Sequence, residues 1–589
     1  MKNQPNPDRE SGNRQTVRWR RTLAVAAAFS LLITSFGGMA IAQDDPAPYY
    51  SDTMEVEQRG GTLRFLLYED PNTLNAVAGA TTIANQVITA ITEGLTENDP
   101  DGNYVPILAA ELPTAENGGV SEDLLTITWA LKEGVVWSDG EPFTSEDVRF
   151  TWEAASNPDS GSALASDYAL IADVQTPDPL TAVVTYSEFN AGYLDQFPWI
   201  LPAHATGEPA DMLNWEFNRN PIGTGPFKLD EWSSGEYLQL SRNENYREEG
   251  KPVLDGLTFL VIPDETVRTQ LMIEEGAELM LWAGQEAEKQ IQAAGTGTSR
   301  TAPGIWVMEM RFNLSKPFDD DPGVEPPHPI LGDIRVREAI TLAVNRDRIN
   351  DELLTGTTTF DIDSPLSVGW MACEVEPFTH NPEAAMALLD EAGWLDEDGD
   401  GVREAHSVPD VEDGTKLSLT MNGYTGFDVL DLIELAVQED LANVGIEASI
   451  ENQEFAVIFG TWADRSPRML GDYDILIYDN GLFAEPGKDI TNLYHPDNVP
   501  SAELPGGDNF QRWVREDVGE WIDAGNTSPE LDVRRENYCN VADAIREDII
   551  TFPILQFAEG SVYSDKLHGY TVSTWEYATW DAENWWLEQ

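Results

Sequence analysis

The chain has 589 residues, more than one hydrophobic core usually serves, so we expect two or more lobes. Hydrophobic residues make up 41%, with 18 Trp and 21 Phe, which argues against disorder despite a formal net charge of −69. So acidic a chain repels nucleic acid phosphates and anionic lipid heads and excludes them as primary partners. We attribute the charge to solubility in an exposed or saline setting rather than to a cationic partner.

Residues 1–42 are typical of an export signal. Basic residues up to Arg21 precede an apolar run from Leu23 to Phe36, and Ala40-Ile41-Ala42 is a small-x-small cleavage site. The run is shorter than the roughly 20 residues that a membrane-spanning helix needs. We therefore expect an exported protein that begins at Gln43, in the periplasm or the extracellular, cell-envelope space, by a Sec or a Tat route.

A strand, a double turn and a capped helix are predicted in the stretch LLTITWALKEGVVWSDGEPFTSEDVRFTW. Ile127, Trp129 and Leu131 alternate with small polar residues, which places them on one face of a strand. Glycine-containing turns follow. Thr144 is a hydroxyl N-cap with Asp147 three residues later, so a helix should begin there.

Three further strands are predicted, at residues 61–67, 255–262 and 279–282. The loop after the first of them is irregular because Pro71 breaks any helix. Residues 220–232 (NPIGTGPFKLDEW) contain a G-x-G pattern, but no third glycine or Gly-Lys-Ser/Thr follows. Nucleotide binding is therefore disfavoured.

Three helices have clear termination signals or apolar faces. Asp264 caps a helix that ends at Gly276 and has Val267, Leu271 and Met272 on one face. One long helix is predicted from Asp333 to Leu354, with inward-facing Ile334, Ile340, Ala343 and Val344. Asn381 caps a third helix, which Gly393 ends.

The run WLDEDGDGVRE is the most metal-like segment. Asp396, Asp398 and Asp400 alternate and Glu404 takes the ninth position of an EF-hand-like Ca²⁺ loop. The twelfth position is Ser407 rather than a bidentate glutamate. We expect weak Ca²⁺ binding at most, or a purely structural turn, and no other cofactor.

The rest of the chain alternates strands and helices. Residues 416–451 predict a β-α-β unit with parallel strands. A strand at 306–313 precedes this region, and later elements are a strand at 474–478, helices at 509–524 and 532–548, and a strand at 554–557. The C-terminal tail should pack on the first lobe through Trp575, Trp580, Trp585 and Trp586.

Catalytic and metal signatures do not stand out. The six histidines are scattered, outside H-E-x-x-H or G-x-S-x-G patterns. A secreted hydrolase with a carboxylate pair stays an alternative, since such a pair leaves no sequence motif. An adhesion module would predict repeats, which we do not find. Cys373 and Cys539 would face an oxidising compartment and could pair, but pairing needs Cα atoms within roughly 7 Å.

Several of these segments also carry a family resemblance. The central stretch, with Ile91-Thr92-Glu93-Gly94-Leu95, GTGPF and the start of the helix at Asp333, resembles the family 5 extracellular solute-binding proteins of ABC importers, the oligopeptide- and dipeptide-binding group. The resemblance runs almost continuously from Gly61 to Leu587. It implies a non-enzymatic receptor, a monomer that captures a peptide or similar small organic solute by lobe closure and delivers it to a membrane-embedded ABC permease.

The resemblance also implies a fold. We expect an α/β, two-lobed fold of the type II periplasmic binding proteins, with a hinge between the lobes. After the signal and a leader at 43–60, lobe one would span 61–305 with an extra subdomain at about 95–220. Lobe two would span 306–557, and residues 558–589 would return to lobe one.

The family's ligand-facing segments suggest which residues line the cleft. They are Tyr68, Asp70, Asn72, Trp282, Trp462, Asp479, Asn480 and Phe483. In peptide-binding relatives, an aspartate four residues before a proline holds the peptide's α-ammonium. Here that proline corresponds to Pro486 and the position to Leu482, so an oligosaccharide ligand stays open beside a peptide.

Overall fold

A computed structural model describes residues 59–315, 326–354, 359–360, 362–367, 369–481 and 485–588. All of them lie in one compact unit, residues 53–589. The predicted signal and nearly all of the leader lie outside the described residues, as does Phe483. Within the described part, no helix combines the length and the apolar character needed to cross a membrane.

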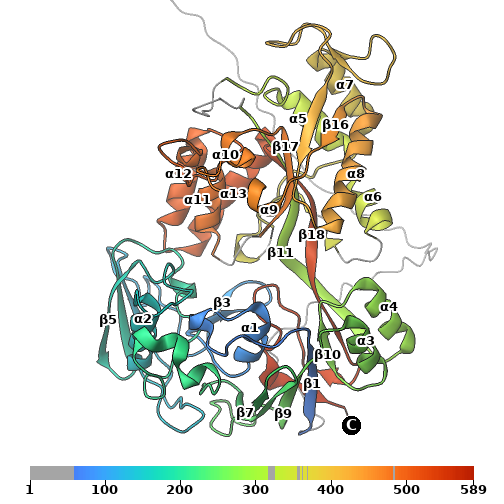
Figure 1. The fold of residues 1–589 in the computed structure, drawn as a ribbon. Helices are drawn as coiled ribbons and strands as arrows, with labels where there is room; N and C mark the ends of the chain where they lie inside the picture. The colour runs from blue at the N-terminus through green and yellow to red at the C-terminus, as the bar shows by residue number, and fades with distance from the viewer. Residues whose placement is uncertain are drawn as a thin grey trace, which may run out of the picture. The chain divides into compact units, whose positions relative to one another are not determined.

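One mixed sheet of 11 strands organises the molecule, in the order β16-β15-β17-β11-β18-β10-β1-β9-β8-β7 with β12 beside β18 (Figure 1). The strands are β1 (Thr62–Leu67), β7 (Phe227–Ser233), β8 (Tyr237–Arg242), β9 (Gly256–Val261), β10 (Leu279–Leu281), β11 (Thr298–Phe312), β12 (Thr359–Phe360), β15 (Ser418–Asn422), β16 (Glu447–Ile450), β17 (Ile475–Gly481) and β18 (Thr551–Tyr563).

Lobe one is built on β1 and β7–β10, with α1 (Thr82–Ile88), α3 (Glu265–Ile273) and α4 (Gln285–Ala294). β1 pairs parallel with β9 and β10, and Leu63 and Phe65 are fully buried. Asp264 caps α3 as predicted. Of the three residues predicted on one face of α3, Met272 is buried and Leu271 packs against the same cluster, whereas Val267 is 48% exposed.

A subdomain on lobe one contains the sheet β4-β6-β5 and a hairpin of β2 and β3. Its elements are β2 (Thr96–Asn98), β3 (Tyr104–Pro106), β4 (Thr126–Ala130), α2 (Ser145–Ser156), β5 (Ile171–Asp178) and β6 (Thr181–Tyr186). Ile127 and Trp129 are buried on one face of β4. Thr144 and Asp147 form a capping box at the start of α2, as the sequence predicts.

Lobe two surrounds β15–β17 with helices. These are α5 (Ile334–Ala343), α6 (Arg346–Arg348), α7 (Pro382–Ala392), α8 (Asp428–Asn443), α9 (Phe455–Ile458), α10 (Pro467–Leu470), α11 (Gly487–Tyr494), α12 (Glu516–Asn526) and α13 (Leu531–Asp548). The predicted β-α-β unit is confirmed, since α8 connects the parallel strands β15 and β16. The caps of α7 are also confirmed: Asn381 accepts the Ala384 N–H, and Gly393 has a φ of 91°.

Two predicted helices of lobe two differ in the structure. The single helix from 333 to 354 is wrong, because Val344 has extended backbone angles and Asn345 caps a new helix, α6, followed by a π-helical turn at Ile349–Leu353. Ile334, predicted to face inward, is 40% exposed. The helix predicted at 509–524 begins only with α12, because the Asn509 side chain folds the preceding residues into a turn by bonding both the N–H and the carbonyl of Trp513.

β11 and β18 belong to both lobes. They pair antiparallel from Thr298 opposite Tyr563 to Arg311 opposite Thr551. Further along, β11 pairs with β17 of lobe two, and β18 pairs with β10 of lobe one. The register shifts between Pro303 and Val307. These two long strands are therefore the continuous connection through which the lobes are joined (Figure 1).

The C-terminal tail packs on lobe one, as predicted. Trp585 is fully buried in the same hydrophobic cluster as Leu63 and Phe65. Two short two-stranded sheets complete the fold: β13 (Trp394–Leu395) with β14 (Glu404–Ala405), and β19 (Leu567–His568) with β20 (Trp586–Leu587).

Candidate functional site

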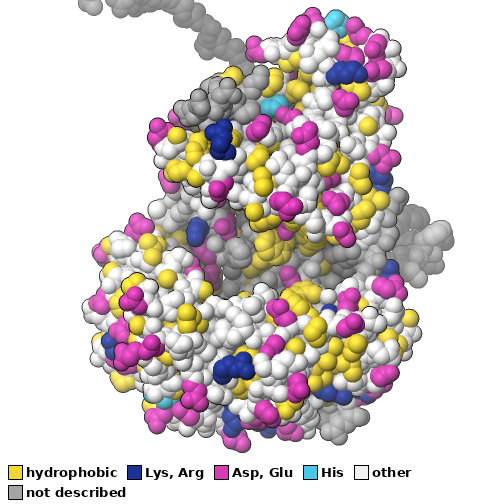
Figure 2. Space-filling model, viewed as in Figure 1, with side chains coloured by type: hydrophobic (Ala, Val, Ile, Leu, Met, Phe, Trp, Pro, Cys, Tyr) yellow, Lys and Arg dark blue, Asp and Glu magenta, His cyan; other side chains and the backbone are white. Residues whose placement is uncertain are grey.

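A cavity of about 560 Å³ lies where the β2 hairpin, the end of β10, the middle of β11 and β18, the start of α11 and the C-terminal tail meet. This volume lies within the range of small-molecule binding sites. Its aromatic lining is Trp199, Trp282, Trp306, Trp575 and Tyr577. Figure 2 shows hydrophobic side chains gathered where the visible face is hollowed, between the regions that carry α9 and α1.

Two of these aromatic side chains are exposed. Trp282 and Trp306 are 40% and 42% exposed, although Trp282 directly follows β10 and Trp306 lies within β11. The Trp282 ring lies edge-on to Tyr68, 6.0 Å away, and its indole N–H donates to Glu559 at 3.3 Å. Trp306 lies beside Gly481, where a Cβ would be 3.1 Å from the ring. Both indoles thus offer faces to an occupant of the cavity.

Trp575 is held between two glycines from different lobes. A Cβ at Gly102, in the β2–β3 turn, would lie 2.8 Å from the Trp575 Nε1 atom and 2.6 Å from the Gly369 Cα. A Cβ at Gly369 would lie 2.6 Å from the Trp575 ring. Only glycine fits at these two positions, which also have φ values of 80° and 66°.

The polar lining is acidic. Its carboxylates are Glu97, Asp195, Glu485, Glu559 and Glu576, and no Lys, Arg or His is among the described residues that line the cavity. The remaining lining side chains are mainly hydroxyls and amides: Thr82, Gln86, Thr89, Thr92, Thr96, Asn98, Ser573 and Thr574.

Burial raises the pKa values of four of these acids, Glu97, Asp195, Glu559 and Glu576. Burial, and the charge of Glu485, raise the pKa of Asp195 to about 7. Burial, and the charge of Asp195, raise the pKa of Glu576 to about 8. Burial, followed by the charge of Glu576, puts the pKa of Glu97 well above its ordinary value. Burial also raises the pKa of Glu559.

Glu485 is the lining acid with a strong internal partner. Arg534 of α13 binds it through both guanidinium nitrogens, with Nη1 2.8 Å from Oε2. The same Nη1 donates to the carbonyl of Ala191 in lobe one, at 3.1 Å. Arg534 therefore ties the loop before α11 to the subdomain on the opposite wall.

The predicted cleft residues occupy different places. Trp282 lines the cavity, and Tyr68 packs against it. Asp70 accepts hydrogen bonds from Trp232 and Ser234. Asn72 bonds the backbone of its own loop, at Gly79 and Thr81.

On lobe two, Asp479 accepts a hydrogen bond from Tyr424, and Asn480 pairs with Val307 in the sheet. Trp462 lies in a turn before α10, partly exposed and outside the lining of this cavity. Trp306, Glu97 and Glu576 also line the cavity but were not predicted from the sequence. The alternation at 306–313 was a usable signal for Trp306, whereas nothing local distinguishes the two glutamates.

The acidic loop at 396–404 bonds mostly to itself. One ligand atom each from Asp396, Asp398 and Glu404 lies within 4.8 Å of the others. Asp396 accepts the N–H groups of Gly399 and Gly401. Asp400 turns to Lys416, 2.6 Å away. The loop thus has the hydrogen bonds of a structural turn, and an arriving Ca²⁺ would compete with them.

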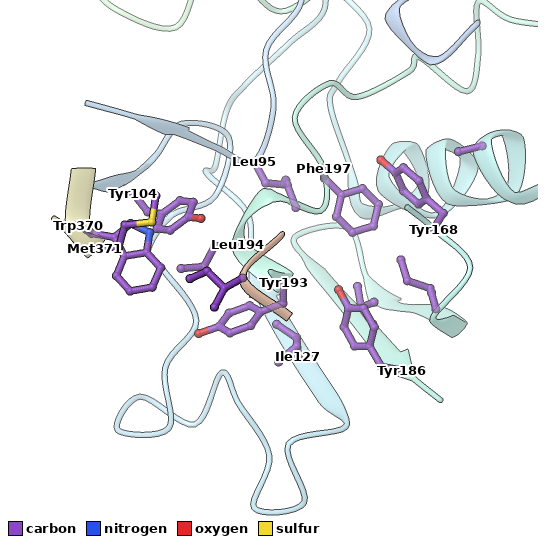
Figure 3. Packing of buried hydrophobic residues seen from close by; sticks show 14 of the residues in the cluster. Leu95, Tyr104, Ile127, Tyr168, Tyr186, Tyr193, Leu194, Phe197, Trp370 and Met371 are labelled. Carbon is purple, nitrogen blue, oxygen red and sulfur yellow. The ribbon is translucent and has the colours of Figure 1, made fainter. Parts of the chain in front are cut away.

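Cys373 and Cys539 are joined by a disulfide, with Cα atoms 5.3 Å apart. The bond attaches the segment around Trp370 and Met371 to α13. Trp370 lies 6.1 Å from the Tyr538 ring and shares a buried cluster with Tyr104 and Leu194 of lobe one. Figure 3 shows Trp370 and Met371 beside Tyr104. The segment around Trp370 and Met371 therefore makes an apolar contact with the β2–β3 hairpin.

Comparisons with known proteins agree with this architecture. Residues 103–500 match the bacterial extracellular solute-binding proteins, family 5. The oligopeptide-binding protein AppA of Bacillus subtilis is 27% identical over 544 residues, which is 88% of this chain and 92% of that protein. A putative ABC transporter peptide-binding protein of Brucella ovis is 28% identical over 450 residues, covering 73% of this chain and 76% of that protein.

Solved structures show the same fold at low identity. The nickel ABC transporter protein of Bacillus halodurans superimposes with a TM-score of 0.72 at 22% identity, over 88% of this chain and 98% of that chain. The murein tripeptide-binding protein MppA, in an unliganded open form, gives 0.71 at 20% identity, over 90% and 98%. The chain belongs to the family 5 bacterial extracellular solute-binding proteins, with their type II periplasmic-binding-protein fold, and is a substrate-binding receptor of ABC importers.

Proposed function

We propose that this receptor captures a short oligopeptide in the 560 Å³ cavity and presents it to an ABC permease. Three facts support a peptide as ligand: the family, the two relatives named for peptide binding, and a lining that combines aromatic faces with hydroxyl and amide groups. The observation that carries the proposal is that both lobes and the strands between them contribute to this lining.

Closure of the lobes would act through β11 and β18. Ile305 and Trp306 line the cavity beside the register shift of β11, and Glu559 lines it from β18. A ligand that contacts these strands and both walls binds the closed arrangement better than an open one. It shifts the equilibrium toward closure only by that difference in affinity.

We expect export and oligomeric state to be those of the family. The signal at residues 1–42 would send the mature chain to the periplasm or cell envelope, where it would act as a monomer and hand its cargo to the permease. The receptor would leave the peptide intact. The alternative of a carboxylate-pair hydrolase is tested by incubating bound peptide with the protein and looking for cleavage products by mass spectrometry.

Tryptophan fluorescence tests the proposal, because Trp282 and Trp306 line the cavity. Native mass spectrometry of the secreted protein first identifies any copurifying solute. Titrations then compare tripeptides to pentapeptides with oligosaccharides of similar size. We expect saturable binding of peptides. Saturable binding of oligosaccharides alone would refute the peptide proposal.

A pair of variants locates the site. Trp306→Ala should weaken peptide binding at least tenfold, about 1.4 kcal/mol. Trp462→Ala is the matched control, because this tryptophan is also partly exposed but lies outside the cavity lining. Its peptide affinity should stay unchanged. If Trp462→Ala lost peptide binding while Trp306→Ala kept it, the binding site would not be this cavity.

A further inference from the structure

We propose that the cavity selects oligopeptides with two or more positive charges, which the carboxylates of Glu97, Asp195, Glu559 and Glu576 would hold. This inference rests on the proposed function, because it names the class of peptide that the same cavity accepts. It differs from the single α-ammonium site of peptide-binding relatives, whose position corresponds to a leucine in this sequence.

None of the four carboxylates forms an ion pair among the described residues. Asp195 accepts a hydrogen bond from the Tyr104 hydroxyl, Glu576 from the backbone N–H of Asn98, and Glu559 from the Trp282 indole. Glu97 has no hydrogen-bond partner among those residues. The nearby cations are already paired, Arg247 with Glu93 and Glu248 and Arg534 with Glu485. Charges in a half-buried cavity are costly without a counter-ion, so a cationic ligand would relieve this cost.

The carboxylates form two groups, which is why we infer more than one ligand charge. Glu97, Glu576 and Asp195 lie around the β2–β3 hairpin: Glu97 belongs to β2, Glu576 accepts the N–H of the neighbouring Asn98, and Asp195 accepts from Tyr104, which pairs with Asn98. Glu559 stands apart, beside Trp282 on the hinge strand β18. A terminal ammonium could meet one group while a lysine or arginine side chain meets the other.

A second feature points to a bound polar ligand. Thr92 lines the cavity, and its hydroxyl has no hydrogen-bond partner within the described part of the chain, so it is free to bond a ligand N–H or carbonyl. The exposed faces of Trp282 and Trp306 add favourable surfaces for ammonium and guanidinium groups.

Calorimetric titrations with matched tripeptides test the inference at pH 8. We expect trilysine to bind at least 100-fold more tightly than trialanine, and triglutamate not to bind. Trilysine affinity should fall as salt is raised, because ionic contacts are screened. Spermidine serves as a probe for polycations that lack a peptide backbone, and it should bind more weakly than trilysine.

Variants assign the effect to the cavity. Glu576→Gln should weaken trilysine binding at least tenfold, and by a larger factor than it weakens trialanine binding. Glu122→Gln is the control, because Glu122 is exposed and outside the cavity. Circular dichroism melting establishes that each variant is folded. Since Glu576 is half-buried, Asp195→Asn provides a second test if Glu576→Gln fails to fold.

The outcomes separate the two proposals. Equal binding of trialanine and trilysine, insensitive to salt, would overturn the charge selection and leave the peptide receptor standing. Binding of spermidine with no binding of any tripeptide would overturn the peptide receptor. An unchanged trilysine affinity in folded Glu576→Gln and Asp195→Asn would overturn the assignment of the charge to these carboxylates.

Discussion

The ion pair of Arg534 and Glu485 gives the sharpest test of how the cavity wall is held. Arg534 is 2% exposed in its side chain and Glu485 18%. Besides the glutamate, the guanidinium bonds the carbonyls of Ala191 and Gly525 and the hydroxyl of Tyr538, each at 3.1 Å. Arg534→Met would leave a carboxylate without its partner and two carbonyls without a donor. Breaking such a pair costs about 3–5 kcal/mol of unfolding free energy.

The double variant Arg534→Met with Glu485→Met tests the cause of this loss. It removes the unpaired carboxylate of Glu485, so its unfolding free energy should exceed that of Arg534→Met alone by at least about 1 kcal/mol. Guanidinium chloride unfolding measures all variants. Arg149→Met is the control, because its pairs with glutamates are exposed and worth about 0–1 kcal/mol. A double variant no more stable than the single one would refute the claim that an unpaired Glu485 causes the loss.

Three other expectations concern the disulfide, pH and calcium. Replacing Cys373 and Cys539 by serine should lower the unfolding free energy by about 2–5 kcal/mol, measured by denaturation; an unchanged value would contradict this. The ligand-free protein should be less stable at pH 8.5 than at pH 5.5. The folded state keeps the protons of Glu576 and Asp195 up to about pH 8 and 7, whereas the unfolded chain releases them near pH 4, so stability is fully present below pH 4 and lost as pH rises. An unfolding free energy that rises from pH 5.5 to pH 8.5 would refute this expectation. Calorimetry should give a Ca²⁺ dissociation constant no tighter than about 10⁻⁴ M at the acidic loop. Submicromolar Ca²⁺ binding that Asp398→Ala abolishes would contradict this expectation.

Helices whose ends are set by local capping residues could be predicted from the sequence. The capping box of α2 needs only Thr144 and Asp147, three residues apart. The ends of α7 need only Asn381 and Gly393. Each of these signals acts within one helical turn, so the chain around it makes no difference to the outcome.

The break between α5 and α6 could not be predicted in this way. Its cause lies on another helix: the backbone N–H of Asn345 donates to Asp440 of α8, 2.9 Å away, instead of continuing the helical ladder. The Asn345 side chain then accepts the Arg348 N–H and starts α6. A contact between residues far apart in the sequence overrides the local helical pattern.

The candidate site shows the same dependence on distant contacts in its polar residues. Asp70 and Asp479 were predicted as ligand contacts from the family resemblance, and each carboxylate accepts a hydrogen bond within its own lobe, from Trp232 or Tyr424. Glu97 and Glu576 looked like ordinary members of a very acidic surface. What sets the latter apart is that folding brings them to one cavity that no Lys, Arg or His of the described residues lines. A carboxylate becomes available to a ligand when the fold leaves it unpaired, and that condition involves residues at both ends of the chain, so no local pattern can reveal it.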